Sequence, residues 1–350
     1  YLRYDDITNM YYLYDEEDIY YFITEILPSL NHSCEIYISE EIKQFNKPRN
    51  LQLNAGIHLK NNLLEIDLNS IHVDKEEIKN IILAFQHNKS YHRLKNGEFI
   101  NLNDETLKEI SHLISDLNID ENKIEDGKIV VDKYHSLYID QFASQSHIQF
   151  TRDEQFSHLI DHIKKPNTTS FTVPKAYQPI LRDYQVTGFK WLKTMSEYGF
   201  GGILADDMGL GKTLQMITLL EDCKDENHVS IVISPATLIY NWADEINKFS
   251  KDLKTLCIAG PLSSRQQAIA QIKDYDVVIT SYDYIRRDYE LYKDYTFYYL
   301  ILDEAQYIKN QSTKNAQAVK EINGFHRFAL TGTPIENSLA ELWSIFDFLM

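Results

Sequence analysis

The sequence predicts an α/β protein, in which a lobe with a central parallel β-sheet flanked by helices follows a smaller α+β domain. The first observation is that short apolar, β-branched runs alternate with helical stretches after about residue 178. Continuous apolar runs are typical of strands buried on both faces, and their alternation with helices is typical of a parallel sheet. The second observation is a hairpin and amphipathic helices in the preceding residues, which indicate a separate unit.

The length supports more than one unit, because 350 residues exceed the roughly 100–200 residues of an ordinary domain. We expect an accessory region at 1–165, either as one unit or as two parts that divide near residue 60. A linker is expected at 166–177, where proline, threonine and asparagine interrupt the periodic pattern. The parallel-sheet lobe then occupies 178–350.

The accessory region shows its clearest patterns after residue 60, whereas residues 1–60 are weakly patterned. An alternating run predicts a half-buried strand at Leu63–Leu68. Asp74 is placed to cap a helix that runs to about Phe85, and Asp104 to open a second helix. Between them, the segment Tyr91–Leu102 predicts a hairpin with Asn96-Gly97 at its turn. The acidic run 15–18 is interpreted as a solvated turn or a helix start.

The lobe is predicted from five apolar runs that are short enough for strands and are separated by helical patterns. These runs are Ile203–Ala205, Val229–Ser234, Val277–Thr280, Tyr298–Leu302 and Phe325–Thr331.

The composition excludes several classes of protein. With 43% hydrophobic and 25% charged residues, the chain is globular rather than disordered. No apolar stretch approaches the ~18 residues of a membrane span, and the three cysteines lie too far apart for a disulfide framework. A net charge of −17 argues against bulk electrostatic coating of nucleic acid. The chain starts at Tyr1 without a leader, so we expect a fragment of a longer protein. We also expect it to be cytoplasmic and monomeric.

A phosphate-binding loop is predicted where L-A-D-D-M-G-L-G-K-T, residues 204–213, joins a strand to a helix. Gly209 and Gly211 allow backbone N–H groups to turn toward phosphates, and the helix N-terminus adds its positive dipole. Lys212 supplies a charge to the β- and γ-phosphates, and Thr213 offers a hydroxyl to magnesium. Asp206 stands where the usual G-x-x-x-x-G-K-[ST] pattern has its first glycine. The alternative is a chance Gly-Lys-Thr turn.

A second motif, Y-Y-L-I-L-D-E-A-Q at 298–306, carries two carboxylates at the end of an apolar run. Asp303 is placed to hold magnesium, directly or through water, and Glu304 to orient and deprotonate the attacking water. The alternative is an ordinary surface Asp-Glu pair, against which the preceding buried run argues. Asp303 lies 303 − 212 = 91 residues after Lys212, which leaves room for the strands of one lobe.

Four further segments complete a recognisable set. They read L-R-D-Y-Q-V-T-G-F-K-W-L at 181–192, I-S-P-A-T-L-I-Y-N-W-A-D-E at 233–245, I-T-S-Y-D at 279–283 and L-T-G-T-P-I-E-N at 330–337. Together with the two motifs above, they resemble the Q motif and motifs I, Ia, Ib, II and III of the Swi/Snf family of superfamily two helicase-like ATPases. The resemblance covers about residues 175–350 and implies a RecA-like P-loop lobe. Residues 60–150 more loosely resemble the accessory region of bacterial, RapA-like members.

The resemblance implies roles for individual residues at the nucleotide. Gln185 is expected to read the adenine edge, in a pocket shaped by Arg182 and Tyr184. The phosphates of ATP are expected to be held, with magnesium, by the loop and the start of its helix. This set is Asp207, Met208, Gly209, Leu210, Gly211, Lys212, Thr213 and Leu214.

The resemblance also implies a nucleic-acid groove and a coupling loop. Small and hydroxyl residues that let a phosphate backbone approach are Ser234, Pro235, Ala236, Thr237, Thr280 and Ser281. For Thr280 and Ser281 an ordinary strand end is an equal alternative, and Trp242 is interpreted as a core residue. Coupling of hydrolysis to strand movement is expected from Gln306, Thr331, Gly332 and Thr333.

An arginine finger, worth ~10³–10⁵ in rate, is expected from a second lobe that the family carries and this sequence lacks. The whole protein is therefore expected to be a DNA-dependent ATPase and duplex-DNA translocase that remodels or displaces DNA-bound proteins, near the bacterial nucleoid. The isolated chain is expected to hydrolyse ATP slowly. Alternatives are a strand-separating helicase, or a non-catalytic module whose accessory region docks a protein such as RNA polymerase.

Overall fold

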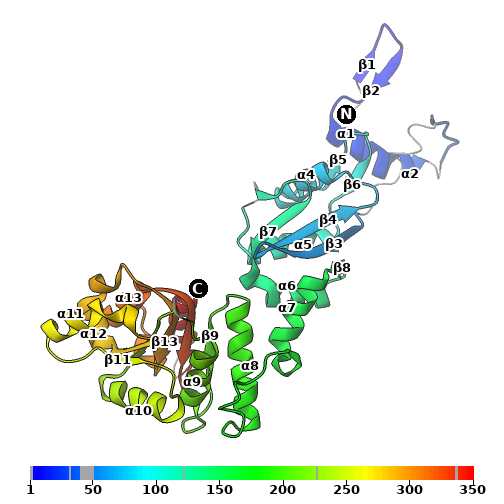
Figure 1. Ribbon diagram of the computed structural model, residues 1–350. Coiled ribbons are helices and arrows are strands. Elements are labelled where there is room, and N and C mark those ends of the chain that lie inside the picture. Colours follow the sequence, from blue (N-terminus) through cyan, green and yellow to red (C-terminus); the bar gives the residue numbers. More distant parts are fainter. Residues whose placement is uncertain (1–2, 31–32, 40–50, 121–122, 226–227, 336–337) are drawn as a thin grey trace. The chain divides into compact units, whose positions relative to one another are not determined.

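The computed structural model describes residues 3–30, 33–39, 51–120, 123–225, 228–335 and 338–350. Its contacts divide the chain into two compact units, Tyr1–Ile160 and Asp161–Met350, which are coloured blue to green and green to red in Figure 1. The boundary falls a few residues before the predicted linker. We describe each unit by itself.

The first unit is built on a four-stranded sheet with the order β7-β4-β3-β8. Its strands are β3 (Leu53–Lys60), β4 (Leu63–Ser70), β7 (Lys128–Asp132) and β8 (Gln149–Arg152). β3 and β4 form an antiparallel hairpin, and Asn61 and Asn62 adopt positive φ angles of 50° and 66° at its turn. Asparagine tolerates this left-handed conformation. The predicted strand at Leu63–Leu68 is confirmed, whereas its partner β3 was not predicted.

Two amphipathic helices bury their apolar faces with this sheet. They are α4 (Lys75–Gln86) and α5 (Glu105–Asp116), and both predicted helix starts are confirmed, although the Asp74 side chain makes no capping hydrogen bond. The Asp104 side chain accepts a hydrogen bond from the Thr106 N–H, 2.8 Å away, as an N-cap residue should. The unit also contains α6 (Ser136–Gln145), and α7 (Glu154–Lys164) crosses the boundary. The core contains Ile57, Leu64, Ile66, Ile78 and Ile110, among others.

The N-terminal part of this unit carries short elements. They are β1 (Arg3–Asp5), β2 (Met10–Tyr12), α1 (Glu16–Tyr21), a π-helical turn (Phe22–Ile26) and α2 (Leu27–Leu30). The acidic run begins a helix, because Asp15 accepts a hydrogen bond from the Glu17 N–H at 2.8 Å. The predicted hairpin at Tyr91–Leu102 is also confirmed. It consists of β5 (Tyr91–Arg93) and β6 (Phe99–Asn101), with Gly97 at a φ of 90°.

The second unit contains a six-stranded, fully parallel sheet with the order β11-β12-β10-β13-β14-β9. The strands are β9 (Gly202–Leu204), β10 (Ser230–Ser234), β11 (Thr255–Cys257), β12 (Val277–Ser281), β13 (Thr296–Asp303) and β14 (Asn323–Leu330). All five predicted strands are present, and the edge strand β11 was not predicted. The α/β fold class is therefore confirmed.

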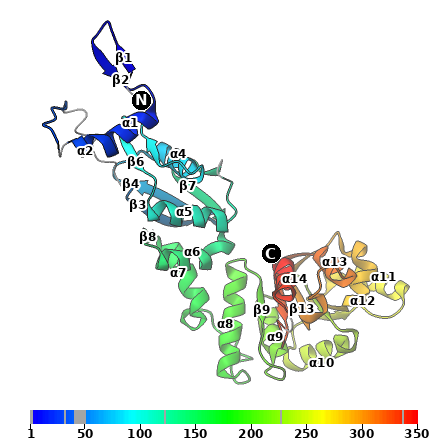
Figure 2. The same cartoon turned by 180° about the vertical axis from the view of Figure 1, so that it is seen from behind.

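Helices cover both faces of this sheet (Figures 1 and 2). They are α8 (Asp183–Glu197), α9 (Lys212–Asp222), α10 (Ile239–Phe249), α11 (Leu262–Ala270), α12 (Tyr282–Asp288), α13 (Lys314–Lys320) and α14 (Leu339–Leu349). One continuous core joins strand residues such as Ile231 and Leu300 to Ile285 of α12, Ala316 of α13 and Phe348 of α14. In the described part of the chain, no helix is long and apolar enough to cross a membrane.

The segment predicted as a linker, 166–177, belongs by its contacts to the second unit. It begins with a 3₁₀ turn at Pro166–Thr168. Val173 and Tyr177 are both buried, so the later part of the segment packs into the folded unit and is not an exposed linker.

Candidate nucleotide site at the strand ends

The parallel sheet gathers the predicted motifs at one edge. The carboxyl ends of parallel strands meet at the same edge, where ligands of open α/β sheets bind. β9 ends directly before the predicted phosphate loop, and β13 ends at Asp303. β14, which ends at Leu330, lies between them in the sheet. The phosphate loop follows β9, the Asp303-Glu304 pair lies at the end of β13, and the predicted coupling residues 331–333 follow β14. These three segments therefore start from neighbouring strands at the same edge of the sheet.

The phosphate loop has the backbone shape that its glycines permit. Gly209 and Gly211 adopt φ angles of 83° and 76°, in the left-handed region that L-residues other than glycine occupy at a cost. Helix α9 begins at Lys212, immediately after Gly211. Because a helix start leaves backbone N–H groups without partners inside the helix, this loop and helix start form the candidate phosphate-binding surface.

Lys212 is held by neutral acceptors of its own loop. Its ammonium group donates to the carbonyl oxygen of Asp206 at 2.7 Å and to that of Asp207 at 3.2 Å. The Asp206 carboxylate, which replaces the first glycine of the usual pattern, accepts a hydrogen bond from the Gln215 side-chain amide at 2.8 Å. Asp206 therefore attaches the loop to α9, a role that the sequence pattern did not predict.

Gln185 is buried against this loop. Its side-chain oxygen accepts a hydrogen bond from the Arg182 N–H at 2.9 Å, and its amide nitrogen donates to the Leu210 carbonyl at 3.0 Å. The Tyr184 hydroxyl donates to the same Leu210 carbonyl at 3.1 Å. The predicted adenine-binding residues thus fasten α8 to the phosphate loop, and the adenine contact itself stays a prediction.

Asp303 is fixed by contacts from three directions. One carboxylate oxygen, Oδ2, accepts a hydrogen bond from the Trp242 indole N–H at 2.8 Å. The other, Oδ1, accepts from the Glu304 backbone N–H at 3.0 Å, and the Asp303 carbonyl accepts from the Tyr282 hydroxyl at 2.8 Å. Burial raises the pKa of Asp303, while the Trp242 hydrogen bond and the Lys212 charge oppose that rise.

Trp242 is buried, as expected of a core residue, but its contact with Asp303 was missed. A buried indole N–H needs a hydrogen-bond acceptor, and this requirement was the available signal. The identity of the acceptor depends on how α10 packs beside the end of β13, which local sequence does not encode.

Glu304 and Gln306 connect the carboxylate motif to the predicted coupling loop, residues 331–333. Glu304 has a left-handed backbone, with φ 52° and ψ 56°, which is uncommon for a residue with a side chain. Its carboxylate accepts a hydrogen bond from the Gln306 amide at 2.7 Å. The Gln306 side-chain oxygen in turn accepts from the Thr331 hydroxyl at 3.0 Å. A continuous hydrogen-bonded path therefore runs from Glu304 to Thr331.

The coupling loop also approaches the phosphate loop. The Thr331 hydroxyl oxygen accepts a hydrogen bond from the Thr333 N–H at 3.1 Å, and the Thr331 N–H donates to the Leu204 carbonyl at 3.2 Å. A methyl group on Gly332 would lie 3.3 Å from Cγ of Met208. The four residues predicted to couple thus lie between the carboxylate motif and the phosphate loop.

The residues predicted to contact nucleic acid differ in exposure. Ala236 and Thr237 are exposed, and they lie in a 3₁₀ turn, Ala236–Leu238, just before α10. Ser234, Thr280 and Ser281 are buried. The Thr280 hydroxyl donates to the Ile258 carbonyl at 3.1 Å, and the Ser281 hydroxyl accepts from the Tyr284 N–H at 3.3 Å. These contacts favour the strand-end interpretation for the last two side chains.

The site fits a magnesium nucleotide by the chemistry of its oxygen donors. Among the described residues, no group of three or more His, Cys, Asp and Glu side chains is placed to hold a metal ion. Magnesium in nucleotide enzymes keeps several waters and is bound by one or two carboxylates plus substrate phosphates. Asp303 and Thr213, both at this sheet edge, supply a carboxylate and a hydroxyl of the required kind.

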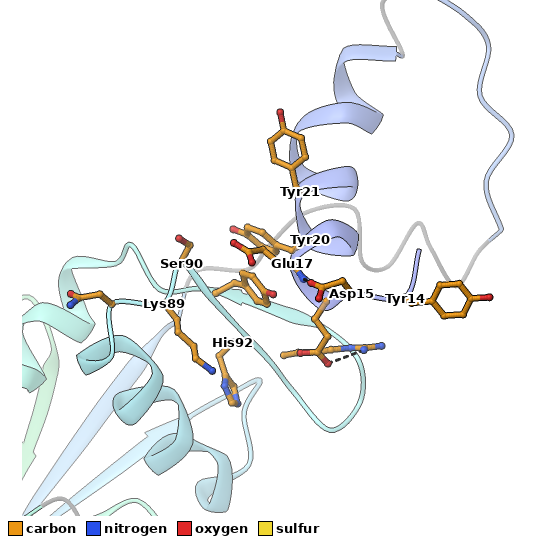
Figure 3. A pocket seen from close by; sticks show the side chains of 12 residues that line it. Tyr14, Asp15, Glu17, Tyr20, Tyr21, Lys89, Ser90 and His92 are labelled. Carbon is orange, nitrogen blue, oxygen red and sulfur yellow. Dashed lines mark hydrogen bonds and ion pairs between the residues drawn. The ribbon is translucent and has the colours of Figure 1, made fainter. Parts of the chain in front are cut away.

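The first unit contains a separate pocket of about 980 Å³. Figure 3 shows its two walls, α1 with the turn before it and the segment 88–93. Tyr20 stacks on Tyr91 with ring centroids 4.2 Å apart, and Arg93 pairs with Glu16 at 3.2 Å. These contacts attach α1 to the β5–β6 hairpin. None of the predicted site residues lines this pocket.

Comparison with known proteins accounts for nearly the whole sequence. Residues 184–350 match the SNF2-related domain, and residues 2–174 match the bacterial SNF2 helicase-associated domain.

Three relatives illustrate the similarity. An uncharacterized ATP-dependent helicase of Mycoplasma pneumoniae is 41% identical, over 55% of this chain and 19% of its own. YwqA of Bacillus subtilis, named as an ATP-dependent helicase/translocase, is 40% identical over 58% of this chain and 22% of its own. The human SWI/SNF-related matrix-associated actin-dependent regulator of chromatin subfamily A member 1 is 35% identical over 57% and 20%.

The chain thus spans about a fifth of the length of these relatives. The two domain matches, the motif set and the parallel-sheet lobe agree with one another. The chain belongs to the Swi/Snf (SNF2) family of helicase-like ATPases and joins a bacterial SNF2 helicase-associated domain to an SNF2-related domain.

Proposed function

We propose that this chain is the ATP-binding part of a DNA-dependent ATPase that moves along duplex DNA and displaces or remodels proteins bound there. The observation that carries the proposal is the hydrogen-bonded path from Glu304 through Gln306 to Thr331. It joins a carboxylate suited to water activation to the loop that follows the next strand. An ordinary surface Asp-Glu pair is not expected to be linked by hydrogen bonds to the end of a neighbouring strand, as Glu304 is linked to Thr331.

The chemistry proposed for the site is hydrolysis of the γ-phosphate by water. ATP phosphates replace the Asp206 and Asp207 carbonyls as the partners of Lys212, and the loop N–H groups receive the remaining phosphate oxygens. Glu304 orients the attacking water and accepts its proton, while Gln306 holds the Glu304 carboxylate in place. Magnesium, held by Asp303 and Thr213, neutralises the phosphate charge when bound.

A second lobe is proposed to complete the active site in the whole protein. Phosphoryl transfer gains ~10³–10⁵ in rate from an arginine finger, and translocation requires lobes that open and close around the nucleotide. The exposed turn at Ala236 and Thr237 is the proposed phosphate-backbone contact on this lobe. With a net charge of −17, the chain alone should bind duplex DNA weakly and in a strongly salt-dependent manner. We propose a cytoplasmic location beside the DNA.

The test is ATP turnover with and without duplex DNA, measured on this chain and on the whole protein. We expect DNA stimulation in the whole protein only, and its loss in a Glu304→Gln variant that still binds ATP. A Glu290→Gln variant, altered at a solvated 3₁₀ turn (Tyr289–Tyr292) away from the strand-end edge, is the matched control and should keep full turnover. ATP binding without stimulated turnover in the whole protein would favour a non-catalytic module, and DNA strand separation would favour a helicase.

A further inference from the structure

Trp242 occupies a position that a simple core residue would not require. It lies on α10, is only 2% exposed, and directs its indole N–H to Oδ2 of Asp303 at 2.8 Å. A phenylalanine would fill a core position without introducing a polar group that must be satisfied. The N–H instead meets a carboxylate, and a hydrogen bond to an ionised acceptor is roughly twice as strong as one between neutral groups.

The other contacts of Asp303 leave one task to Trp242. The Glu304 N–H holds Oδ1 from within the same loop, and the Tyr282 hydroxyl holds the Asp303 main chain. Only the indole, among these three contacts, fixes the carboxylate from a different element of the lobe. Without the indole N–H, the buried Oδ2 atom of Asp303 would lose this hydrogen bond, and the Asp303 side chain would rotate more easily.

We propose that Trp242 is a positioning residue that orients the Asp303 carboxylate for magnesium. This inference rests on the proposed role of Asp303 in holding the metal of a bound magnesium nucleotide. Hydrogen-bond partners of metal ligands fix the orientation of those ligands, and their loss typically costs 10–100-fold in metal affinity. Trp242 performs this task from α10, the helix that directly follows the proposed phosphate-backbone contact.

The decisive variant is Trp242→Phe in the full chain, because it keeps an aromatic ring and removes the N–H. The smaller ring also alters the packing, and the Asp303→Asn background separates that effect from the loss of the hydrogen bond. Binding of a fluorescent ATP analogue would be titrated at fixed protein concentration, first in EDTA and then with increasing magnesium. We expect near-normal affinity in EDTA and about a tenfold higher magnesium requirement. Trp191→Phe, on α8 of the same lobe, is the matched control and should leave the magnesium requirement unchanged.

A double variant separates orientation from packing. In an Asp303→Asn background the carboxylate is already gone, so adding Trp242→Phe should change the magnesium requirement less than twofold. A full tenfold effect in that background would show that Trp242 acts through packing and would overturn the proposal. An unchanged magnesium requirement in the single variant would overturn it as well. A wild-type chain whose nucleotide binding ignores magnesium would overturn both this inference and the proposed role of Asp303.

Tryptophan emission provides a readout that does not depend on the Phe variant folding. In a Trp191→Phe/Trp343→Phe chain, Trp242 is the remaining tryptophan of the three. Adding magnesium at saturating nucleotide should change its emission, because the carboxylate bound to its N–H changes its surroundings. The change should disappear when Asp303 is replaced by alanine. An emission unaffected by magnesium in the otherwise unaltered site would contradict the positioning role.

Discussion

The two glycines of the phosphate loop should respond differently to the same substitution. Both have positive φ angles, 83° at Gly209 and 76° at Gly211, so alanine costs about 1 kcal/mol of backbone strain at either position. At Gly209 nothing lies within 4 Å of the added methyl group, whereas at Gly211 the Gln185 amide nitrogen lies 2.4 Å from it. Gln185 must therefore move and release the Leu210 carbonyl, which costs about a further 1 kcal/mol.

We accordingly expect Gly209→Ala to lower the free energy of unfolding of the lobe by about 1 kcal/mol and Gly211→Ala by about 2 kcal/mol. The assay is urea unfolding followed by tryptophan fluorescence. All three tryptophans, Trp191, Trp242 and Trp343, lie in the second unit, so the signal reports that unit alone.

A double-mutant cycle identifies the cause of the difference. In a Gln185→Ala background the side chain that obstructs the Gly211 methyl group is absent, so the two glycine substitutions should cost the same. Coupling between Gln185 and Gly211 should then equal the roughly 1 kcal/mol gap between the single variants. Equal losses for both glycines while Gln185 is present would refute the reasoning, because the steric contact would then carry no energy.

Three further predictions concern the site and its support. Gln306→Ala should reduce ATP turnover of the whole protein by about tenfold or more, with unchanged ATP binding, because it releases the Glu304 carboxylate; a larger effect on binding than on turnover would contradict this. Burial raises the pKa of Asp303 in the folded lobe above its value in the unfolded chain. Protonation of Asp303 therefore stabilises the folded lobe. This stabilisation is complete at pH values below the pKa of the unfolded chain, and it is lost as the pH rises through the pKa of the folded lobe. Asp303→Asn should therefore raise the urea midpoint at neutral pH, and the difference in midpoint between the variant and the unaltered chain should become smaller as the pH is lowered. A lower midpoint for the variant at pH 7 would contradict a costly buried charge at Asp303. Asp288→Ala should destabilise the lobe by about 3–5 kcal/mol, because it leaves Arg265 buried without the carboxylate that binds it at 2.5 and 2.9 Å; replacing both residues by Met and Leu should cost much less, as measured by the same unfolding assay.

The sequence was sufficient for elements whose pattern is local. β10 and β12 are buried along their whole length, so their apolar runs predict a strand of a parallel sheet from the local sequence alone. β11 was missed because it has only three residues, all partly exposed, and its strand state depends on pairing with β12. β3 was missed because its pairing with β4 and β8 compensates for a weak alternation of its own.

The contacts of the site were less predictable than its residues. The carboxylate motif pointed to Asp303 and the family resemblance to Gln185 as candidate site residues, but neither carried information on their hydrogen-bond partners. Trp242 and Asp303 are 61 residues apart, and their contact exists only because α10 and β13 belong to the same folded lobe. Both the oxygen and the nitrogen of the Gln185 side-chain amide likewise form hydrogen bonds with the protein, which a role in binding adenine alone would not suggest.

The unusual Asp206 shows how such contacts shape the proposed reaction. Its carbonyl and that of Asp207 satisfy the Lys212 ammonium, so the charge is held at the loop by neutral acceptors and not by a carboxylate. A neutral carbonyl is a weaker partner for an ammonium than an ionised phosphate oxygen. In the proposed reaction, binding of ATP would therefore exchange weaker hydrogen bonds of Lys212 for stronger ones, whereas a lysine paired with a carboxylate would lose an ion pair. The Asp206 carboxylate is meanwhile bound to Gln215 of α9, while the lysine proposed to bind the phosphates contacts the backbone carbonyl of the same residue.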